Sequence, residues 1–247
     1  MKMLNFIGIG SAFNTQLGNT SAFIKEGNSL LLIDSGGTVF HKLQKLNLFD
    51  GLNKIYIVIT HTHPDHVGSL GEIIFYSYYI LGHKPTILFP NRELIKNFLA
   101  SIGVSHEMYL LVSSSRASII DENFGEVSIE FLSVSHVDTI PSYGFVIGQV
   151  EGVSYYSGDS NSIKNEIITR LSTGEIDRLY QDTCGLDYEG NNHMSLRKLE
   201  ETINPNLRNK VYCMHLDKHI NQKEIVCQGF NVAKIFKGHS EELNDIP

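Results

Sequence analysis

The sequence predicts one α/β domain spanning residues 1–247. Residues 55–59 are apolar, β-branched or aromatic, which is typical of a buried strand. Residues 68–81 follow with the pattern of a helix, and a histidine-rich loop separates the two segments. A chain of 247 residues with 42% hydrophobic residues is long and apolar enough for one large core.

The remaining segments continue this mixture of strands and helices. Apolar or alternating runs predict further strands at residues 4–9, 19–24, 29–33, 86–89, 125–132, 145–150, 152–156, 177–181 and 210–214. Helical patterns predict helices at residues 38–46, 91–101, 161–171 and 196–203. Residues 225–235 could add edge structure or a subunit contact. The glycine-rich segment 8–13 predicts a tight turn or, as a weaker alternative, a phosphate cradle.

Net charge, cysteine content and the lengths of apolar runs limit the classes of function that are expected. The formal net charge of −7 disfavours general binding of large nucleic acids, which requires a basic surface. The three cysteines form no CxxC pair, which favours a reduced, cytoplasmic setting. No segment approaches the roughly 20 apolar residues of a membrane helix, and the N-terminal run is too short for a signal peptide. We therefore expect a cytoplasmic protein that does not contact a membrane.

The loop after residues 55–59 carries the strongest chemical signal. It reads His61-Thr-His63-Pro-Asp65-His66, so that three imidazoles and one carboxylate fall within six positions. Nitrogen and oxygen donors of this kind bind divalent metal ions such as zinc. His61 and His63 can chelate one ion, and Asp65 and His66 can serve a second. The alternative is a solvated polar loop that is rich in histidine by chance.

This loop resembles the signature of the metallo-β-lactamase superfamily. The resemblance implies an αββα sandwich of two mixed sheets flanked by helices, with two divalent ions, zinc or alternatively manganese, at one edge. It places later ligands near strand ends, where His136, Asp159 and His215 occur. The implied sets are His61, His63 and His136 for one ion and Asp65, His66 and His215 for the other, with Asp159 bridging them.

Further residues resemble the RNase Z branch of this superfamily. The resemblance implies that Asp34 supports the metal-binding loop, although Asp34 could also cap the helix at 38–46. It also implies that His193 is a catalytic proton donor. The ligand Asp65 is assigned a catalytic role as well. The plainer alternative is that His193 is a helix cap or a surface residue. Ser142 and Tyr143 lie in a similar motif and could contact substrate, or Tyr143 could simply open the next strand.

Only residues 137–158 separate His136 from Asp159, which leaves no room for the long arm with which RNase Z grips precursor tRNA. The chain thus resembles the phage anti-Pycsar enzymes, homodimers that hydrolyse 3′,5′-cyclic nucleotides such as cyclic CMP and cyclic UMP and counteract antiphage signalling. Cyclic AMP and cyclic GMP are further expected substrates. For a phage protein, the host cytoplasm is the expected location. The main alternative is an armless tRNA 3′-processing endonuclease.

Two other hypotheses remain open. A hydrolase of thioesters or lactones would not need His193, and a nucleotide-sequestering protein would bind without turnover. The other histidines have no strand-end placement and are expected to be structural or at the surface: His41, His83, His106, His219 and His239.

Overall fold

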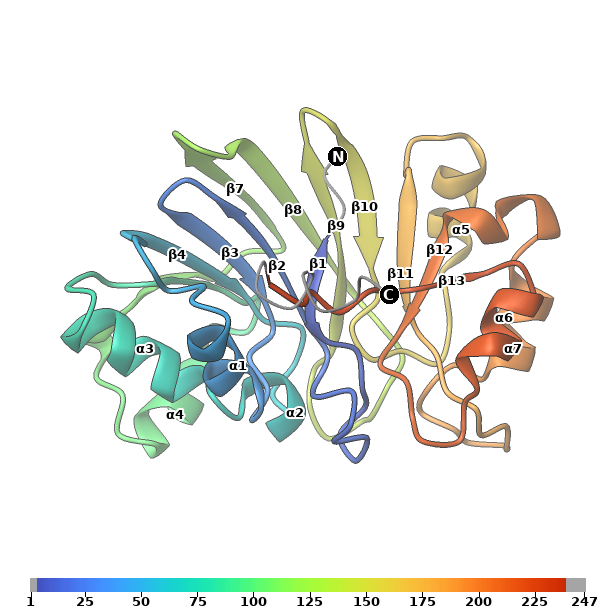
Figure 1. Cartoon of the computed structure of the whole chain (residues 1–247), viewed down its shortest axis with the longest axis horizontal. Helices are drawn as coiled ribbons and strands as arrows, with labels where there is room; N and C mark the ends of the chain where they lie inside the picture. The colour runs from blue at the N-terminus through green and yellow to red at the C-terminus, as the bar shows by residue number, and fades with distance from the viewer. Residues whose placement is uncertain (1–3, 239–247) are drawn as a thin grey trace, which may run out of the picture.

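The computed structural model describes residues 4–238, which fold into two mixed sheets with helices outside them (Figure 1). The first sheet has the order β1-β2-β3-β4-β5-β6 and the second the order β13-β12-β11-β10-β9-β8-β7. In each sheet a run of parallel strands continues into antiparallel ones. The predicted αββα sandwich is confirmed.

The first half of the chain builds the first sheet and the helices that flank it. Its strands are β1 (Asn5–Gly8), β2 (Ser21–Glu26), β3 (Ser29–Ile33), β4 (Lys54–Val58), β5 (Thr86–Leu88) and β6 (Leu110–Val112). Its helices are α1 (Val39–Lys45), α2 (Pro64–Val67), α3 (Leu70–Tyr79), α4 (Arg92–Ser101) and the 3₁₀ helix η1 (His106–Met108).

The second half builds the second sheet and its helices. Its strands are β7 (Arg116–Asp121), β8 (Gly125–Ser133), β9 (Tyr143–Gln149), β10 (Gly152–Tyr156), β11 (Arg178–Asp182), β12 (Val211–Met214) and β13 (Asn231–Val232). Its helices are α5 (Asn165–Ser172), α6 (Leu196–Thr202), the 3₁₀ helix η2 (Pro205–Lys210) and α7 (Gln222–Cys227).

Strand β3 illustrates why the sheets lie inside. Its side chains alternate between the two hydrophobic clusters of the protein, because successive strand residues point to opposite faces. Leu30 and Leu32 pack under the first set of helices, whereas Leu31 and Ile33 pack between the sheets. A strand buried on both faces reads as a continuous apolar run, as this sequence does.

Several predicted elements differ from the structure. Strands β6 and β7 were not predicted, because both are short or have exposed faces with little apolar alternation. Helix α5 begins at Asn165 rather than 161. The predicted helix at 68–81 is preceded by the separate one-turn helix α2 within the histidine loop. The segment 225–235 does form edge structure, since β13 pairs with β12.

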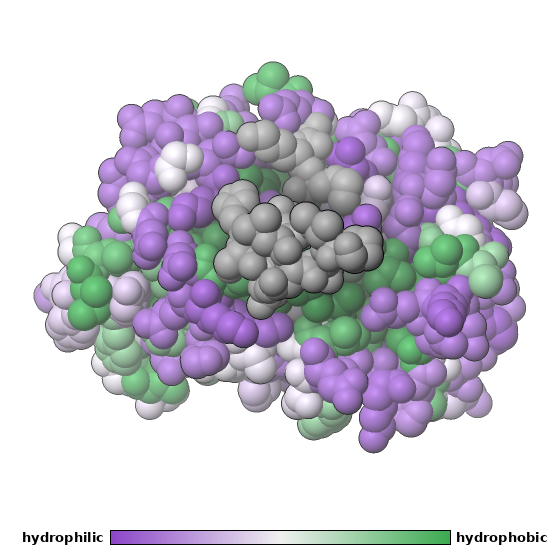
Figure 2. Space-filling view, viewed as in Figure 1, coloured by the Kyte–Doolittle hydropathy of each residue, from purple (hydrophilic) through white to green (hydrophobic). Residues whose placement is uncertain are grey.

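Hydrophilic residues predominate on the face of the molecule that Figure 2 shows. Within residues 4–238, no helix has the length and apolar character needed to cross a bilayer. The described cysteines are all free, and Cys213 is buried in the core.

Candidate metal centre

The predicted metal ligands meet at the ends of strands from both sheets. His61, His63, Asp65 and His66 follow β4 of the first sheet. In the second sheet His136 follows β8, Asp159 follows β10 and His215 follows β12. Segments up to 150 positions apart in the sequence thus supply neighbouring side chains.

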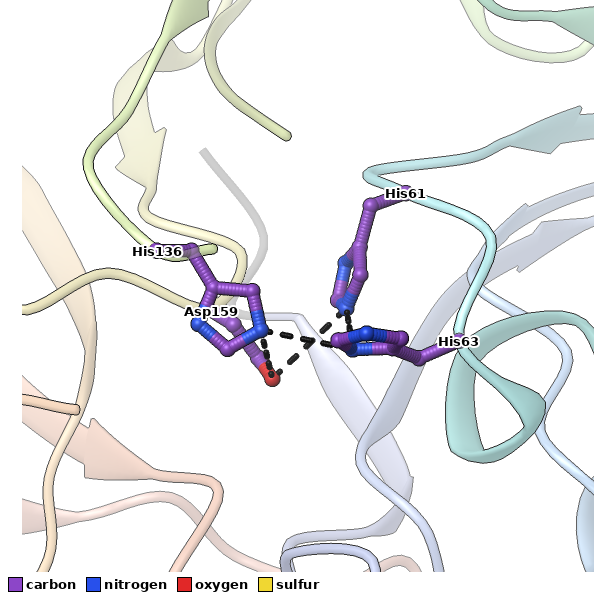
Figure 3. A group of neighbouring side chains, drawn as sticks. All are labelled: His61, His63, His136 and Asp159. Carbon is purple, nitrogen blue, oxygen red and sulfur yellow. Dashed lines mark hydrogen bonds and ion pairs between the residues drawn. The ribbon is translucent and has the colours of Figure 1, made fainter. Parts of the chain in front are cut away.

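Four of these residues form the first ligand group: His61, His63, His136 and Asp159 (Figure 3). His61 Nε2 lies 2.9 Å from His63 Nδ1, and His136 Nε2 lies 3.3 Å from the same atom. Oδ2 of Asp159 is 3.7 Å from Nε2 of both His61 and His136. The donor atoms of this group converge on one point.

The second ligand group comprises Asp65, His66, Asp159 and His215. Nε2 of His66 lies 3.2 Å from Oδ1 of Asp159, and Nε2 of His215 lies 3.4 Å from the same oxygen. Oδ2 of Asp65 is 3.4 Å from His66 Nε2 and 3.2 Å from His215 Nε2. Asp159 therefore directs one carboxylate oxygen to each group, the arrangement that a bridging ligand requires.

These donors fit divalent metal ions. Within each group the donor atoms lie within 4.8 Å of one another, and imidazole with carboxylate is a donor set that zinc and manganese accept. His66 Nε2 and Asp159 Oδ1 are buried and lack a hydrogen-bond partner in the described chain. Buried polar atoms normally have partners, so a cation within the second ligand group would satisfy both atoms.

The imidazoles of the two groups differ electrostatically. Burial lowers the pKa of His61 and of His63, which leaves both rings neutral and able to bind metal. Burial also acts against the charged form of His66, but Asp159 and Asp34 raise its pKa well above the usual value. Asp159 and Asp182 likewise overcome burial and raise the pKa of His215 to about 10.

Asp34 fixes the histidine loop through hydrogen bonds. It accepts hydrogen bonds of 2.8 Å from the Thr60 amide, the Thr60 hydroxyl and His66 Nδ1. It makes none of the helix-capping contacts considered above, because the N-cap of α1 is Thr38. Glycine at position 36 is required beside it, since a Cβ atom there would lie 1.9 Å from the Asp65 carbonyl oxygen. These contacts fix the position and tautomer of His66.

Two site residues occupy backbone conformations that are rare outside glycine. Asp34 has φ 58° directly after β3, and His215 has φ 56° directly after β12. Left-handed conformations cost roughly 1–2 kcal/mol for a residue with a Cβ atom. Both side chains reach the ligand groups from these turns: Asp34 bonds His66, and Nε2 of His215 lies 3.4 Å from Oδ1 of Asp159.

His193 lies beside the ligand groups and is paired with Asp182, a residue that the sequence analysis did not identify. Its Nδ1 lies 2.7 Å from Oδ2 of Asp182, which is buried at the end of β11. Oδ1 of Asp182 lies 3.3 Å from Nδ1 of His215. Asp182 raises the pKa of His193 against the opposing effect of burial. The N-cap of α6 is Ser195, so His193 is not a helix cap.

A cavity of about 810 Å³ opens over both groups. It is lined by ligand residues and by the loops that follow β1, β11 and β12, including Phe13, Tyr188, His193 and His219. His219 was expected to be structural or at the surface, and its place in the cavity wall was not foreseen. His83 contacts Ser77, while His41 and His106 are exposed; His239 lies outside the described residues.

Ser142 and Tyr143 do not line this cavity. Ser142 is buried, and the Tyr143 ring packs against Phe89 and Phe131 with centroid distances of 5.6 and 6.1 Å. Tyr143 begins β9, the alternative considered for it, and pairs there with Ser133 of β8. The cavity therefore gives no support to substrate contact by either residue.

Comparison with known proteins places this site in a family. The model of the family described as "Anti-Pycsar protein Apyc1" matches residues 1–235. This chain belongs to the anti-Pycsar Apyc1 family. The relative from Paenibacillus harenae is 27% identical over 228 residues, covering 89% of this chain and 91% of that protein. The relative from Bacillus phage 010DV004 is 30% identical over 238 residues, covering 86% and 88%.

The solved structures agree on the fold of this family member. The metallo-β-lactamase fold protein YhfI from Bacillus subtilis superposes with a TM-score of 0.71 and covers 95% of each chain at 18% identity. At that identity the similarity establishes a shared fold. The resemblance to the superfamily and to its anti-Pycsar members is confirmed.

Proposed function

We propose that this chain is a metal-dependent phosphodiesterase. It hydrolyses 3′,5′-cyclic nucleotides, cyclic CMP and cyclic UMP and also cyclic AMP and cyclic GMP, to 5′-monophosphates and so counteracts cyclic-nucleotide antiphage signalling. The observation that carries this proposal is Asp159, which faces a separate ligand group with each carboxylate oxygen. Membership in a family named for opposing Pycsar supports the class of substrate.

Two divalent ions, zinc or manganese, would be held by His61, His63, His136, Asp65, His66 and His215, with Asp159 between the ions. Such a pair supplies positive charge beside a phosphoryl group and lowers the pKa of water to about 7. The chain itself contributes the buried carboxylates that orient the ligands. Asp34 holds His66 through Nδ1, and Asp182 lies against Nδ1 of His215, so both rings direct Nε2 toward the site.

His193 and Asp182 provide the proton that the leaving group needs. Nδ1 of His193 donates a hydrogen bond to Oδ2 of Asp182, which leaves Nε2 of the half-buried ring for the cavity. A proton donated from Nε2 to the departing 3′-oxygen would complete cleavage of the P–O3′ bond. Proton donation of this kind typically contributes about 10²–10⁴-fold in rate. A thioester or lactone hydrolase would not require this pair.

The size of the site favours a small substrate over tRNA. Between His136 and Asp159 the chain forms only one loop and the hairpin of β9 and β10. No arm projects from this part of the described chain. A cavity of about 810 Å³ is within the usual range of roughly 300–1,000 Å³ for small-ligand pockets. These features support a cyclic mononucleotide rather than an RNase Z substrate.

A substrate panel tests this proposal. Protein loaded with zinc or manganese is incubated with each cyclic nucleotide, a precursor tRNA and a lactone, and products are separated by chromatography. We expect 5′-monophosphates from the cyclic nucleotides. Preferred cleavage of tRNA or lactone would overturn the proposal, and release of unchanged cyclic nucleotide from a tight complex would indicate sequestration without turnover.

The role of His193 has its own test. His193→Ala should reduce kcat by about 10²–10⁴-fold while the metal content measured by mass spectrometry stays at the wild-type level. His41→Ala, which alters an exposed histidine on α1, is the matched control and should change neither quantity. Loss of metal from His193→Ala would make His193 a ligand and not a proton donor.

We also propose that the protein acts as a homodimer in the cytoplasm, where cyclic-nucleotide signals accumulate. Sedimentation equilibrium tests the assembly, and a monomer at micromolar concentration would contradict it.

A further inference from the structure

Phe13 is an unusually exposed aromatic residue at the rim of the cavity. Its side chain is 91% exposed, although it lies on the loop between β1 and β2 and lines the same cavity as the ligand groups. Exposed single hydrophobic residues are common. Phe13, however, lines a concave site, and such sites bind ligands largely through hydrophobic and aromatic side chains.

The loop that carries Phe13 is held in place. The Ser11 amide donates to the Leu216 carbonyl at 3.0 Å, and Asn14 Nδ2 donates to the same oxygen at 3.0 Å. The Asn14 amide also closes a turn onto the Ser11 carbonyl at 3.0 Å. Leu216 directly follows the ligand His215, so these bonds fix the Phe13 backbone relative to the second ligand group.

Gly10 allows this loop to pack closely. A Cβ atom at position 10 would lie 2.6 Å from the Asn14 carbonyl oxygen and 2.8 Å from that of Gly18. The glycine-rich segment is therefore a tight turn, as predicted, and its effect is to present residues 11–13 to the cavity.

Other apolar residues around the cavity are less suited to receive a flat ring. Tyr188 is 60% exposed and Leu186 is 44% exposed, and both lie on the loop after β11. Tyr188 also lines an adjacent polar depression with Arg197 and Lys198, so its ring is shared between two surfaces. Phe13 has a fully apolar ring, and its loop is bonded to the segment that carries His215.

We propose that Phe13 is the stacking platform for the nucleobase of the substrate. This inference rests on the proposed function, in which the phosphate of a cyclic nucleotide lies at the ligand groups. The base then extends toward the cavity rim and lies against the Phe13 ring. Every base has a π face, so stacking provides affinity without strong base preference. Phe13 thus accounts for acceptance of several cyclic nucleotides by one site.

The test compares substrates with and without a base. Phe13→Ala should raise KM for cyclic CMP by about 5- to 100-fold, the usual effect of losing one base–aromatic stack, with little change in kcat. KM for ribose 3′,5′-cyclic phosphate, which has no base, should be unchanged by the same substitution. Phe13→Trp should restore a low KM. Phosphorus NMR follows ring opening of both substrates.

Two further variants sharpen this experiment. Tyr79→Ala removes a 63% exposed aromatic residue on α3 that does not line the cavity and should leave both KM values unchanged. Tyr188→Ala should raise KM for cyclic CMP less than Phe13→Ala does. A larger effect at Tyr188, an equal KM increase for the substrate without a base, or an unchanged KM in Phe13→Ala would each overturn the assignment.

A binding measurement separates this inference from the proposed function. Saturation transfer from the protein to the base protons of 5′-CMP should be strong in wild type and lost in Phe13→Ala, whether or not any cyclic nucleotide is hydrolysed. Absence of hydrolysis by wild type with transfer intact would overturn the function alone. Equal transfer in both proteins, or a Phe13→Ala protein that dissociates from dimer to monomer, would overturn the platform.

Discussion

Buried carboxylates hold both ends of the sandwich, but they do so for different purposes. At the cavity end Asp34, Asp159 and Asp182 bond histidines and leave donor atoms without partners. At the opposite end Asp121 accepts hydrogen bonds from Ser29, Tyr56 and two amides of its own turn. The atoms at the cavity end suit a cation, whereas the hydrogen bonds of Asp121 are made within the chain.

The carboxylates at the cavity end are therefore expected to serve function, and Asp121 is expected to serve stability. Asp121 ends β7 of the second sheet, whereas Ser29 and Tyr56 belong to β3 and β4 of the first, so its bonds join the two sheets directly. Burial acts to raise its pKa, but the amide and hydroxyl donors outweigh that effect and the pKa of Asp121 is lowered. Changes at the cavity end should therefore alter metal and activity, and changes at Asp121 should alter folding.

The largest effect is expected from changing Asp159, the proposed shared ligand. Asp159→Asn keeps the size of the side chain but removes the charge that faces both groups. We expect kcat to fall by about 10³-fold or more, because metal ions contribute several kcal/mol to charge stabilisation. Metal content after dialysis should also fall. A variant with full metal content and full activity would show that Asp159 does not bridge.

A smaller loss is expected when only a supporting residue is changed. Asp34→Asn replaces the carboxylate behind His66, and such substitutions typically cost about 10–100-fold in metal affinity. Titration with zinc in the presence of a competing chelator measures this loss, and excess metal should restore most activity. Asp121→Asn, a buried aspartate away from the site, is the matched control and should keep wild-type metal affinity.

The smallest effect on activity, essentially none, is expected at the far end. Asp121→Asn should lower the free energy of unfolding by about 1.5–3 kcal/mol, the usual contribution of hydrogen bonds to a charged acceptor. Urea denaturation of the metal-loaded protein measures the change. Tyr56→Phe, which removes one of these bonds, should have a smaller effect.

The pH dependence of this change has a defined sign. The folded-state pKa of Asp121 lies below its unfolded value of about 3.9. The stability it contributes is therefore fully present above about pH 4 and is lost as the pH falls through the folded-state pKa. The difference in Tm between wild type and Asp121→Asn should shrink below pH 4. A difference that grows with acidification would contradict the assignment.

The sequence was informative about the proposed ligands because each one follows a recognisable strand. His136, Asp159 and His215 stand just after apolar runs, and the histidine loop has a distinctive spacing. The backbone at Asp34 and His215, with positive φ, could not be read from the sequence, since neither residue is glycine.

Asp182 was missed for a physical reason. The sequence predicts a strand at 177–181, which leaves Asp182 just outside it. Its partner His215 follows β12, and only the pairing of β11 with β12 brings the two residues together. Conversely, Tyr143 and Ser142 were suggested as substrate contacts by a local motif, but packing turns the Tyr143 ring against Phe89 and Phe131. Long-range packing decides such cases and leaves little trace in a local pattern.

The two ligand groups draw on both sheets, so ion binding would be coupled to the integrity of the whole sandwich. A cation in the first group would join His61 to His136, and a cation in the second would join His66 to His215. Both would act as cross-links that exist only in the folded state. By mass action, free metal at 100 times its dissociation constant would add about 2.7 kcal/mol to the unfolding free energy. A chelator that removed the metal would then lower the free energy of unfolding by the same amount.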